Sequence, residues 1–308
     1  MGYIEVFSLT FSLFFAIMVG FFARRKNLLT ERSTLEFSIF VIRVLFPLFL
    51  FRSAITYMSK EYLLSAPIYP LLHMAICLIM LAVSGWITKA AKISPEREPI
   101  LRFSSLVGNT GFLGLTFATV FFESEEVIAG ILYDFGGSLM LFFVLIPVLL
   151  DRNNRHDPKR IFREPNIIAV ISGLLLGLLG IRIPEFLVPS FTLISQVTLP
   201  LALIICGSQL GGMQFNREAR YTQAFYVILI KMILMPILMV VLLQFLPLTD
   251  RVKQFLILMS AMPSGISMVN FSNTYHQDSD FAAFAVFSTT LFSMVWLPGL
   301  LLISEYIF

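Results

Sequence analysis

The sequence predicts an all-α polytopic membrane protein whose ten transmembrane helices form two inverted five-helix repeats. Three observations predict this fold: an apolar composition, basic residues in alternate loops, and landmarks that recur half a chain apart. Of the 308 residues, 57% are hydrophobic and only 13% are charged, whereas a soluble domain has roughly 45–50% apolar and about 25% charged residues. The mean hydropathy of +0.86 agrees. The chain is therefore expected to lie in a lipid bilayer.

Apolar segments of membrane-spanning length follow one another along the whole chain. A bilayer core of about 30 Å needs roughly 20 mostly apolar residues per helix. Charged and Pro/Gly-rich breaks divide the sequence into ten such segments, and the short connections between them leave no appended soluble domain. The predicted spans are 4–22, 35–57, 66–88, 100–122, 127–150, 166–181, 190–210, 222–246, 254–275 and 280–304.

Lysine and arginine concentrate on one side of the predicted membrane. The loops after spans 1, 3, 5 and 7, with the adjoining span ends, hold Arg24, Arg25, Lys26, Arg32, Lys89, Lys92, Arg97, Arg102, Arg152, Arg155, Lys159, Arg160, Arg163, Arg217 and Arg220. The opposite side holds Lys60, Arg182, Arg251 and Lys253. Positive charge marks the cytoplasmic face. We therefore expect a multi-pass protein of the cell (plasma or inner) membrane with both termini on the non-cytoplasmic side.

Landmark residues recur at a nearly constant spacing, which predicts an internal repeat. The matched pairs are Pro47 with Pro200, 153 residues apart, Asn109 with Pro263, 154 apart, and Pro147 with Pro298, 151 apart. The predicted repeats are residues 1–150 and 164–308. Because each half contains an odd number of spans, the two halves must be inverted relative to one another.

Two polar segments interrupt the fourth and ninth spans: VGNTGFLG (107–114) and AMPSGISMVNFSN (261–273). Glycine and proline weaken the helical ladder, and the freed backbone groups persist only where protein or a water-filled cavity surrounds them. Helix ends at such breaks carry partial charges that bind ions. The alternative is that the glycines only allow close helix packing and the polar side chains bond a neighbouring helix. The predicted substrate-binding residues are Asn109, Thr110, Gly111, Pro263, Ser264 and Gly265.

The segments GNTGFLGL (108–115), EPNIIAVISGLLLG (164–177) and the long run 260–298 resemble the auxin efflux carrier family, in particular its short prokaryotic members. The resemblance covers essentially all ten spans. It implies a fold of the bile-acid-symporter type, in which helices 4 and 9 cross at their unwound centres. A scaffold from spans 1, 2, 6 and 7 would face a moving core from spans 3, 4, 5, 8, 9 and 10.

The resemblance also implies elevator-type movement of organic anions: auxin in plants, and short carboxylates such as malonate or malate in bacteria. In the family the asparagine of the first crossover helps to bind the substrate carboxylate, which carries that role onto Asn109, and the second-crossover proline maps onto Pro263. Elevator scaffolds commonly dimerise, so a homodimer is left open. Gly108 and Thr116 stand where plant members have proline, and 151–164 replaces their long central loop. Plant-like substrate preference is therefore not assumed.

Several ionisable or polar residues fall inside predicted spans, where charge is costly and functional by default. Asp134 lies roughly 12 Å into span 5, at about 1.5 Å per residue, and is expected to carry a coupling proton or to pair with a cation. Lys231, near the middle of span 8, could pair with Asp134 or extend to an interface. Arg52, Ser208 and Gln209 are expected to line the cavity. The alternatives are extension of Arg52 to the interface and helix–helix hydrogen bonds for the other two.

The sequence offers no support for an enzyme, a cofactor or a nucleic-acid partner. A net charge of +3 is too small to suggest nucleic acid. The motifs HExxH, GxSxG, CxxC and a Walker glycine loop are absent, the three histidines are scattered, and Cys77 and Cys206 fall in apolar runs, so no metal site is expected.

The first hypothesis is a secondary transporter for a small organic anion, driven by protons or the membrane potential. A sodium-coupled symporter of the same fold is one alternative, and a membrane sensor that binds without transporting is another. Sodium would need oxygen ligands beside the breaks. The oxygen-bearing residues there are Ser104, Ser105, Asn109, Ser264 and Ser267.

Overall fold

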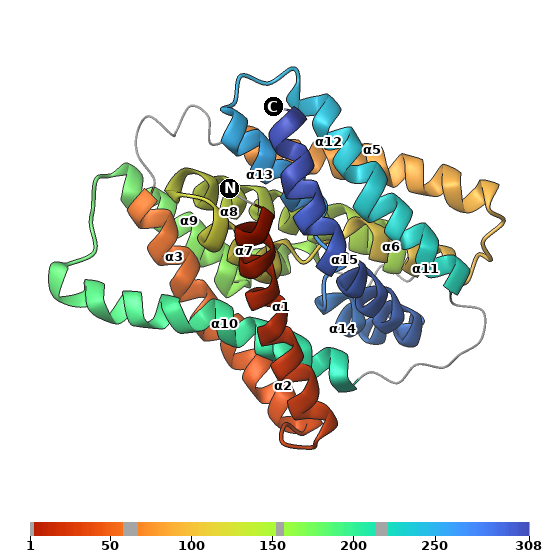
Figure 1. Cartoon of the computed structure of the whole chain (residues 1–308), viewed down its shortest axis with the longest axis horizontal. Helices are drawn as coiled ribbons and strands as arrows, with labels where there is room; N and C mark the ends of the chain where they lie inside the picture. Colours follow the sequence, from red (N-terminus) through yellow and green to blue (C-terminus); the bar gives the residue numbers. More distant parts are fainter. Residues whose placement is uncertain (1–2, 58–66, 152–156, 213–220, 308) are drawn as a thin grey trace.

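The computed structural model describes residues 3–57, 67–151, 157–212 and 221–307, in which the regular elements are all helices and no β-strand occurs (Figure 1). The predicted all-α class is confirmed. The α-helices are α1 (Tyr3–Arg25), α2 (Glu31–Phe40), α3 (Phe46–Tyr57), α5 (Ile68–Ala90), α6 (Glu98–Leu106), α7 (Leu115–Phe121), α8 (Ser124–Met140), α9 (Pro165–Leu178), α10 (Val188–Gly212), α11 (Tyr221–Ile228), α12 (Met235–Leu243), α13 (Asp250–Ser260), α14 (Ser267–Thr274) and α15 (Ser279–Ile307). The π-helical segments are η1 (Val41–Leu45), η2 (Thr110–Gly114), η3 (Leu141–Leu150) and η6 (Leu229–Leu234), and the 3-10 segments are η4 (Pro158–Arg163) and η5 (Glu185–Leu187).

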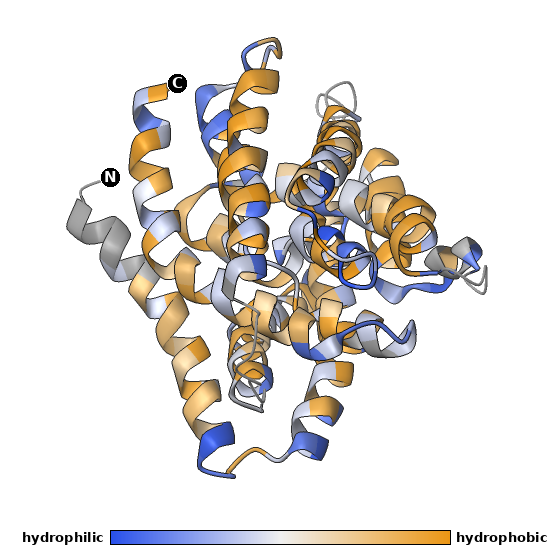
Figure 2. Ribbon diagram, turned by 90° about the vertical axis from the view of Figure 1, so that its right-hand side faces the viewer, coloured by the Kyte–Doolittle hydropathy of each residue, from blue (hydrophilic) through white to orange (hydrophobic). Residues whose placement is uncertain are grey.

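Among the described residues, six helical stretches are long and apolar enough to cross a membrane: Glu31–Thr56, Ile68–Ala90, Glu125–Leu150, Glu185–Gly212, Thr222–Leu243 and Ser279–Ile307. Thr110–Phe121 and Pro165–Leu178 are apolar but shorter. Figure 2 shows apolar colouring along the helices and hydrophilic colouring at the loop that joins α1 to α2. Large apolar side chains such as Trp86 and Val295 lie exposed on the outside. These features are those of a polytopic membrane protein.

Three of the four π-helical segments described lie at a proline. Pro47 and Pro236 stand two residues after the ends of η1 and η6, and Pro147 lies inside η3. Proline has no N–H to donate to the preceding turn, and its ring clashes with the carbonyl there, so the regular ladder cannot continue. Single π-turns of this kind are frequent at functional sites. Here η1 leads directly to Phe46 and η6 contains Lys231, and both of these residues contact the break in the fourth span.

Glycines let helices from the two halves of the chain touch backbone to backbone. A Cβ on Gly20 of α1 would lie 1.8 Å from the Ile204 carbonyl oxygen of α10, and one on Gly207 would lie 1.8 Å from the Ile17 oxygen. Helix α3 packs along α9, where a Cβ on Gly173 would lie 2.8 Å from a backbone oxygen of α3. The helices α1, α3, α9 and α10 therefore form one tightly packed group (Figure 1).

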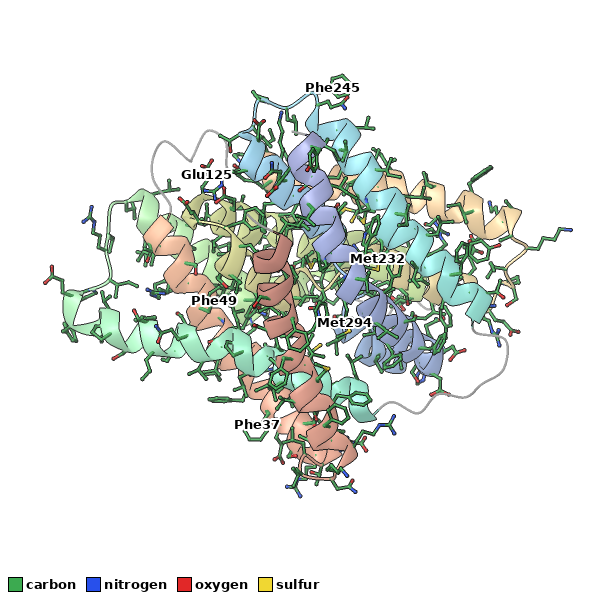
Figure 3. All side chains as sticks on the ribbon, in the orientation of Figure 1. Phe37, Phe49, Glu125, Met232, Phe245 and Met294 are labelled. Carbon is green, nitrogen blue, oxygen red and sulfur yellow. The ribbon has the colours of Figure 1, made fainter. Side chains whose placement is uncertain are left out.

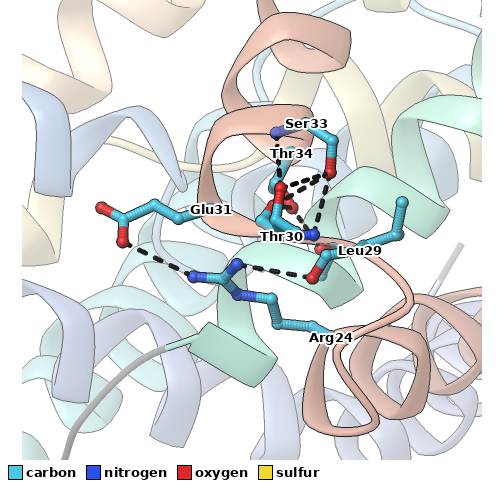
Figure 4. Close-up of polar contacts among 7 residues, drawn as sticks. Arg24, Leu29, Thr30, Glu31, Ser33 and Thr34 are labelled. Carbon is cyan, nitrogen blue, oxygen red and sulfur yellow. Dashed lines mark hydrogen bonds and ion pairs between the residues drawn. The ribbon is translucent and has the colours of Figure 1, made fainter.

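The turn between α1 and α2 is fixed by polar contacts (Figure 4). The Thr30 hydroxyl accepts from the Ser33 N–H at 3.1 Å, and the Ser33 hydroxyl accepts from the Thr30 N–H at 2.9 Å, which is a capping box. Arg24 donates to the Leu29 carbonyl at 3.4 Å and lies 3.8 Å from the Glu31 carboxylate. These contacts set the direction in which α2 enters the molecule.

Candidate functional site

The breaks in the fourth and ninth spans lie against each other. The first separates α6, which ends at Leu106, from η2, which begins at Thr110; the second separates α13 from α14. The Asn109 N–H donates to the Pro263 carbonyl at 2.7 Å, and the Gly265 N–H donates to the Val107 carbonyl at 3.1 Å. Together they make a short antiparallel bridge. Backbone groups freed by each break are thus satisfied by the other break.

Hydrogen bonds of Ser264 to two other segments also hold this crossing together. The Ser264 hydroxyl donates to the Ser104 carbonyl at 2.7 Å, and the Ser264 N–H donates to the Thr289 hydroxyl of α15 at 3.1 Å. Ser264 is fully buried. Of the predicted binding residues in the second break, Ser264 and Pro263 therefore hold the two breaks together, while Gly265 faces a cavity.

A cavity of about 210 Å³ opens at the crossing. Its floor is the first break, with Asn109, Thr110 and Gly111, and its wall includes Gly265 and Ser267 from the second. The remaining walls come from α2, η1, α3, α5, α8, η3, α9 and α10. In the predicted topology the lining residues of α2, α9 and α10 lie near the cytoplasmic ends of their spans, whereas His73 and Asp134 lie in the outer half. Four of the six predicted binding residues therefore line one cavity.

The Asn109 amide is the best-placed binding group in this cavity. Asn109 is 6% exposed, and its backbone is held at both ends by the bond to Pro263 and by the Gly114 N–H, which donates to the Asn109 carbonyl at 3.1 Å. Within the part of the chain that the structure describes, its side chain makes no hydrogen bond. A fixed amide with unused donors and acceptor can bind a carboxylate or another polar group.

Asp134 of α8 reaches the same break through Thr110. The Thr110 hydroxyl donates a short hydrogen bond to the Asp134 carboxylate, and both residues line the cavity. A Cβ on Gly111 would lie 3.7 Å from that carboxylate oxygen and 3.4 Å from the Phe46 ring, both ordinary contact distances, which places the Asp134 carboxylate and the Phe46 ring beside this glycine. An ionisable group thus lies one side chain away from the first break.

Lys231 contacts the first break from its other side. The residue is 1% exposed, which rules out the extended, interfacial position considered from the sequence. A Cβ on Gly108 would lie 2.8 Å from the Lys231 ammonium nitrogen, whose hydrogen bond goes to the Met235 sulfur at 3.2 Å. The structure records no ion pair between Lys231 and Asp134. The two residues instead flank the same glycine-rich backbone.

The three residues predicted to line the cavity have different positions. Gln209 of α10 lines it and donates to the Ser38 hydroxyl at 3.2 Å. Ser208 forms a helix–helix hydrogen bond with Thr34 at 2.6 Å and does not line this cavity. Arg52 lines a second cavity, separate from the first.

His73 and Cys77 of α5 line the first cavity, although the sequence suggested no role for them. His73 Nδ1 is 2.7 Å from the Tyr133 carbonyl oxygen, and its ring stacks on that of Tyr133 with centroids 4.0 Å apart. A Cβ on Gly136 would lie 2.4 Å from the Pro70 carbonyl oxygen, and one on Gly137 would lie 2.4 Å from the His73 ring. The glycine pair after Asp134 was the signal for this close helix contact.

Two of the four serines considered as sodium ligands donate their hydroxyl hydrogen bonds to backbone carbonyls. The Ser105 hydroxyl donates to the Leu101 carbonyl at 2.8 Å, and Ser264 donates as described above. The Ser104 hydroxyl is buried with no partner, and Ser267 lines the cavity. Among the described residues, no group of three or more His, Cys, Asp or Glu side chains is arranged to hold a metal ion.

Comparison with known proteins supports transport. The family model described as membrane transport protein matches residues 5–151 and 152–301. The chain belongs to this family. The resemblance to auxin efflux carriers inferred from the sequence is thereby confirmed. A relative, the uncharacterized transporter MJ1031 of Methanocaldococcus jannaschii, is 25% identical over 289 residues, which cover 91% of this chain and 92% of the relative. The present chain is a multi-pass membrane protein of this family, and neither the family nor the transporter relative gives a reason to expect catalysis.

Proposed function

We propose that the protein is a secondary active transporter of small organic anions, carboxylates in the first place. The observation that carries the proposal is the Asn109 side-chain amide, which lies in the cavity where the two broken helices join and has no hydrogen-bond partner among the described residues, while its backbone is held in place. Behind this backbone lies the Lys231 ammonium, buried without a carboxylate partner. A buried charge is costly unless a counter-charge is supplied. A bound carboxylate would supply it.

We propose an elevator-type mechanism with a scaffold of spans 1, 2, 6 and 7 and a moving core of the remaining spans. The close packing of α1 with α10 and of α3 with α9 supports this division. It also supports the inverted repeats 1–150 and 164–308. In the repeat, span 1 corresponds to span 6 and span 2 to span 7. The contact between spans 1 and 7 therefore has its counterpart in the contact between spans 6 and 2. The helices at the two breaks would then move as one unit, because hydrogen bonds join them.

Coupling to protons or to the membrane potential fits the charges at the crossing better than coupling to sodium. A sodium ion at the first break would lie close to the buried Lys231 ammonium, and like charges repel strongly where the effective dielectric constant is low. Asp134 offers a carboxylate that could take up and release a proton beside the Thr110 hydroxyl. We therefore propose Asp134 as the proton carrier and Lys231 as the fixed countercharge.

The test is uptake of radiolabelled malonate, malate and indole-3-acetate into proteoliposomes, with pH, sodium and voltage gradients imposed in turn. Accumulation of one of these anions under a pH or voltage gradient supports the proposal. Asn109→Ala should reduce it by on the order of tenfold or more, since a hydrogen bond to a charged group contributes about 1.5–3 kcal/mol.

Asn166→Ala is the matched control, because Asn166 lines the same cavity from α9, away from the breaks. It should keep most of the activity. An equal loss in both variants would contradict a site at the breaks. Binding of an anion without accumulation under any gradient would contradict transport and favour a sensor.

A further inference from the structure

A second cavity, of about 400 Å³, lies between the proposed scaffold and the proposed core. Helices α1, α3 and α10 line it on one side, and α7 and α8 line it on the other. In the predicted topology its walls belong to the outer half of the membrane. The volume is within the range of roughly 300–1,000 Å³ that small-molecule sites occupy.

The charged group of this cavity is Arg52. It is half-buried within a helical stretch apolar enough to span a membrane. In the described part of the chain it makes neither a hydrogen bond nor an ion pair. Other arginines are paired with carboxylates: Arg24 with Glu31, Arg32 with Glu36, Arg102 with Glu98, and Arg251 with Glu123. An arginine left unpaired at this depth is costly, and an anionic ligand would offset that cost.

Two further donors in the cavity are free to accompany Arg52. Ser53, which is 3% exposed, and Gln196 both line the cavity, and neither side chain forms a hydrogen bond with any described residue. The hydroxyls of Thr116 and Thr119, by contrast, donate to backbone carbonyls at 2.5 and 2.9 Å. A guanidinium with a hydroxyl and an amide beside it matches the acceptors of a carboxylate.

The neighbouring carboxylate does not neutralise Arg52. Glu126 precedes the lining residue Val127, but its carboxylate turns to the helix end and accepts from the Glu123 N–H at 3.0 Å. Glu123 in turn pairs with Arg251 at 2.7 Å. Both acidic side chains are therefore engaged at the start of α8.

Aromatic rings separate the two cavities. Phe46 and Phe112 line the first cavity, whereas Phe49 lines the second. The Phe46 and Phe112 rings meet edge to face with centroids 5.1 Å apart, and the Phe46 and Phe49 rings stack at 6.0 Å. Figure 3 shows Phe49 beside α1 in this part of the molecule. An anion at Arg52 would thus lie beyond this aromatic barrier from Asn109.

We propose that the second cavity is a separate binding site for a small carboxylate, held by Arg52 with Ser53 and Gln196. It goes beyond the proposed function, because it needs only that a carboxylate reaches the outer cavity and not that Asn109 binds one. The site would collect the anion on the outer side of the aromatic barrier, independently of the cavity at the crossing.

The experiment measures protection of a cysteine in the second cavity. Val120 lines this cavity, is 37% exposed and offers no ligand, so Val120→Cys is the reporter. The full chain is reconstituted in phosphatidylcholine vesicles and reacted from outside with an impermeant, negatively charged methanethiosulfonate. Cys77 and Cys206 are buried, and the chain without the reporter gives the background. Malonate is the probe.

Malonate should slow the reaction. Arg52→Gln should raise the malonate concentration for half-protection about tenfold, as expected for loss of one charge-assisted hydrogen-bonded pair. Arg52→Lys, which keeps the charge, should lie between, and it also controls for misfolding. Arg43→Gln should have no effect, because Arg43 is exposed on the same span and does not line the cavity.

Introducing Asn109→Ala into the reporter separates this inference from the proposed function. Protection that persists there supports a separate site even if no transport is found. Protection that Asn109→Ala removes and Arg52→Gln leaves intact would overturn the inference. A second pattern would also overturn it: malonate gives no protection in phosphatidylcholine vesicles, the reporter reacts slowly in phosphatidylglycerol vesicles, and Arg52→Gln restores fast reaction there. The ligand of Arg52 would then be a lipid headgroup.

Discussion

At the scale of single residues, Asp134 and Lys231 carry opposite charges on the two sides of one glycine-rich backbone. Asp134→Asn keeps an oxygen that can accept from Thr110 but removes the ionisable group. If Asp134 carries the coupled proton, anion exchange should be retained while accumulation driven by an imposed proton gradient falls to the level seen without a gradient. Counterflow and gradient-driven uptake in proteoliposomes measure the two activities. Asp157→Asn, at an exposed position, is the control, and unchanged accumulation would make Asp134 structural.

Lys231→Met tests whether the buried ammonium serves binding or folding. Replacing a buried charge by an apolar side chain of similar length is often neutral or stabilising. We therefore expect an unfolding temperature equal to or above that of the wild type, together with loss of uptake. Lys89→Met, at the exposed end of α5, should change neither. A lower unfolding temperature with retained uptake would assign Lys231 to folding.

The sequence revealed cavity residues whose local composition is unusual for a membrane span and missed those whose local composition is ordinary. Asn109 and Thr110 were found because a polar, glycine-rich segment contradicts its apolar surroundings within one stretch of chain. His73 and Phe46 lie in ordinary apolar helices and join the cavity only because α3 and α5 pack against α8, which carries Asp134. Ser264 was found for its position but points into the crossing, since the Ser104 carbonyl is its acceptor. Side-chain direction across a contact is not encoded locally.

At the scale of helices, the contact between α1 and α10 depends on glycine. Gly207→Ala would place a Cβ 1.8 Å from the Ile17 carbonyl oxygen, so the two backbones must separate. Overpacking of this kind costs roughly 1–3 kcal/mol. Gly299→Ala is the control, because nothing lies within 4 Å of its added Cβ, and a helical Gly→Ala change there should be neutral or stabilising by about 0.4–1 kcal/mol. Thermal unfolding of the two purified variants compares them, and equal unfolding temperatures would contradict the contact.

The sequence located the helices better than their irregularities. Most described residues of each predicted span are helical, because apolar length is a strong signal, but only six helical stretches among them are long and apolar enough to cross a membrane. The π-helical turns η1 and η3 lie at Pro47 and Pro147, whereas their repeat partners Pro200 and Pro298 lie inside the regular helices α10 and α15, so proline alone did not indicate where the irregularities occur. The pairing of Asn109 with Pro263 links the two residues that the repeat had matched, but a spacing of 154 residues cannot show that they touch. That information comes only from the packing of the two halves.

At the scale of the whole molecule, α1 begins and α15 ends on the same side in both views (Figures 1 and 2). The distribution of basic residues predicts that this side is outside. Single cysteines at Leu28, Phe245 and Tyr306 test it, since these side chains are 79%, 79% and 92% exposed. In intact cells an impermeant maleimide should label Phe245→Cys and Tyr306→Cys, and Leu28→Cys only after permeabilisation. The reverse pattern would invert the topology. Labelling of Phe245→Cys and Tyr306→Cys from opposite faces of the membrane would overturn the ten-span count.

Relative motion of scaffold and core should be blocked by a covalent link across their boundary and not by one within the scaffold. Two aromatic pairs of similar separation offer the comparison: Phe46 and Phe112, with ring centroids 5.1 Å apart, join α3 to η2, whereas Phe51 and Phe191, 6.0 Å apart, join α3 to α10. Each pair is replaced by cysteines and treated with a bifunctional methanethiosulfonate. Malonate uptake should be lost on cross-linking the first pair and regained on reduction, because α3 is assigned to the scaffold and η2 to the core.

The second pair should cross-link without loss, since both of its helices are assigned to the scaffold. Each single-cysteine variant controls for modification alone, and gel mobility after proteolysis confirms the link. Uptake that survives a complete link between positions 46 and 112 would mean that α3 and η2 do not move past each other. Alternating access would then have to come from local rearrangement at the joined breaks, where Asn109 is already held by hydrogen bonds on both sides of its peptide units.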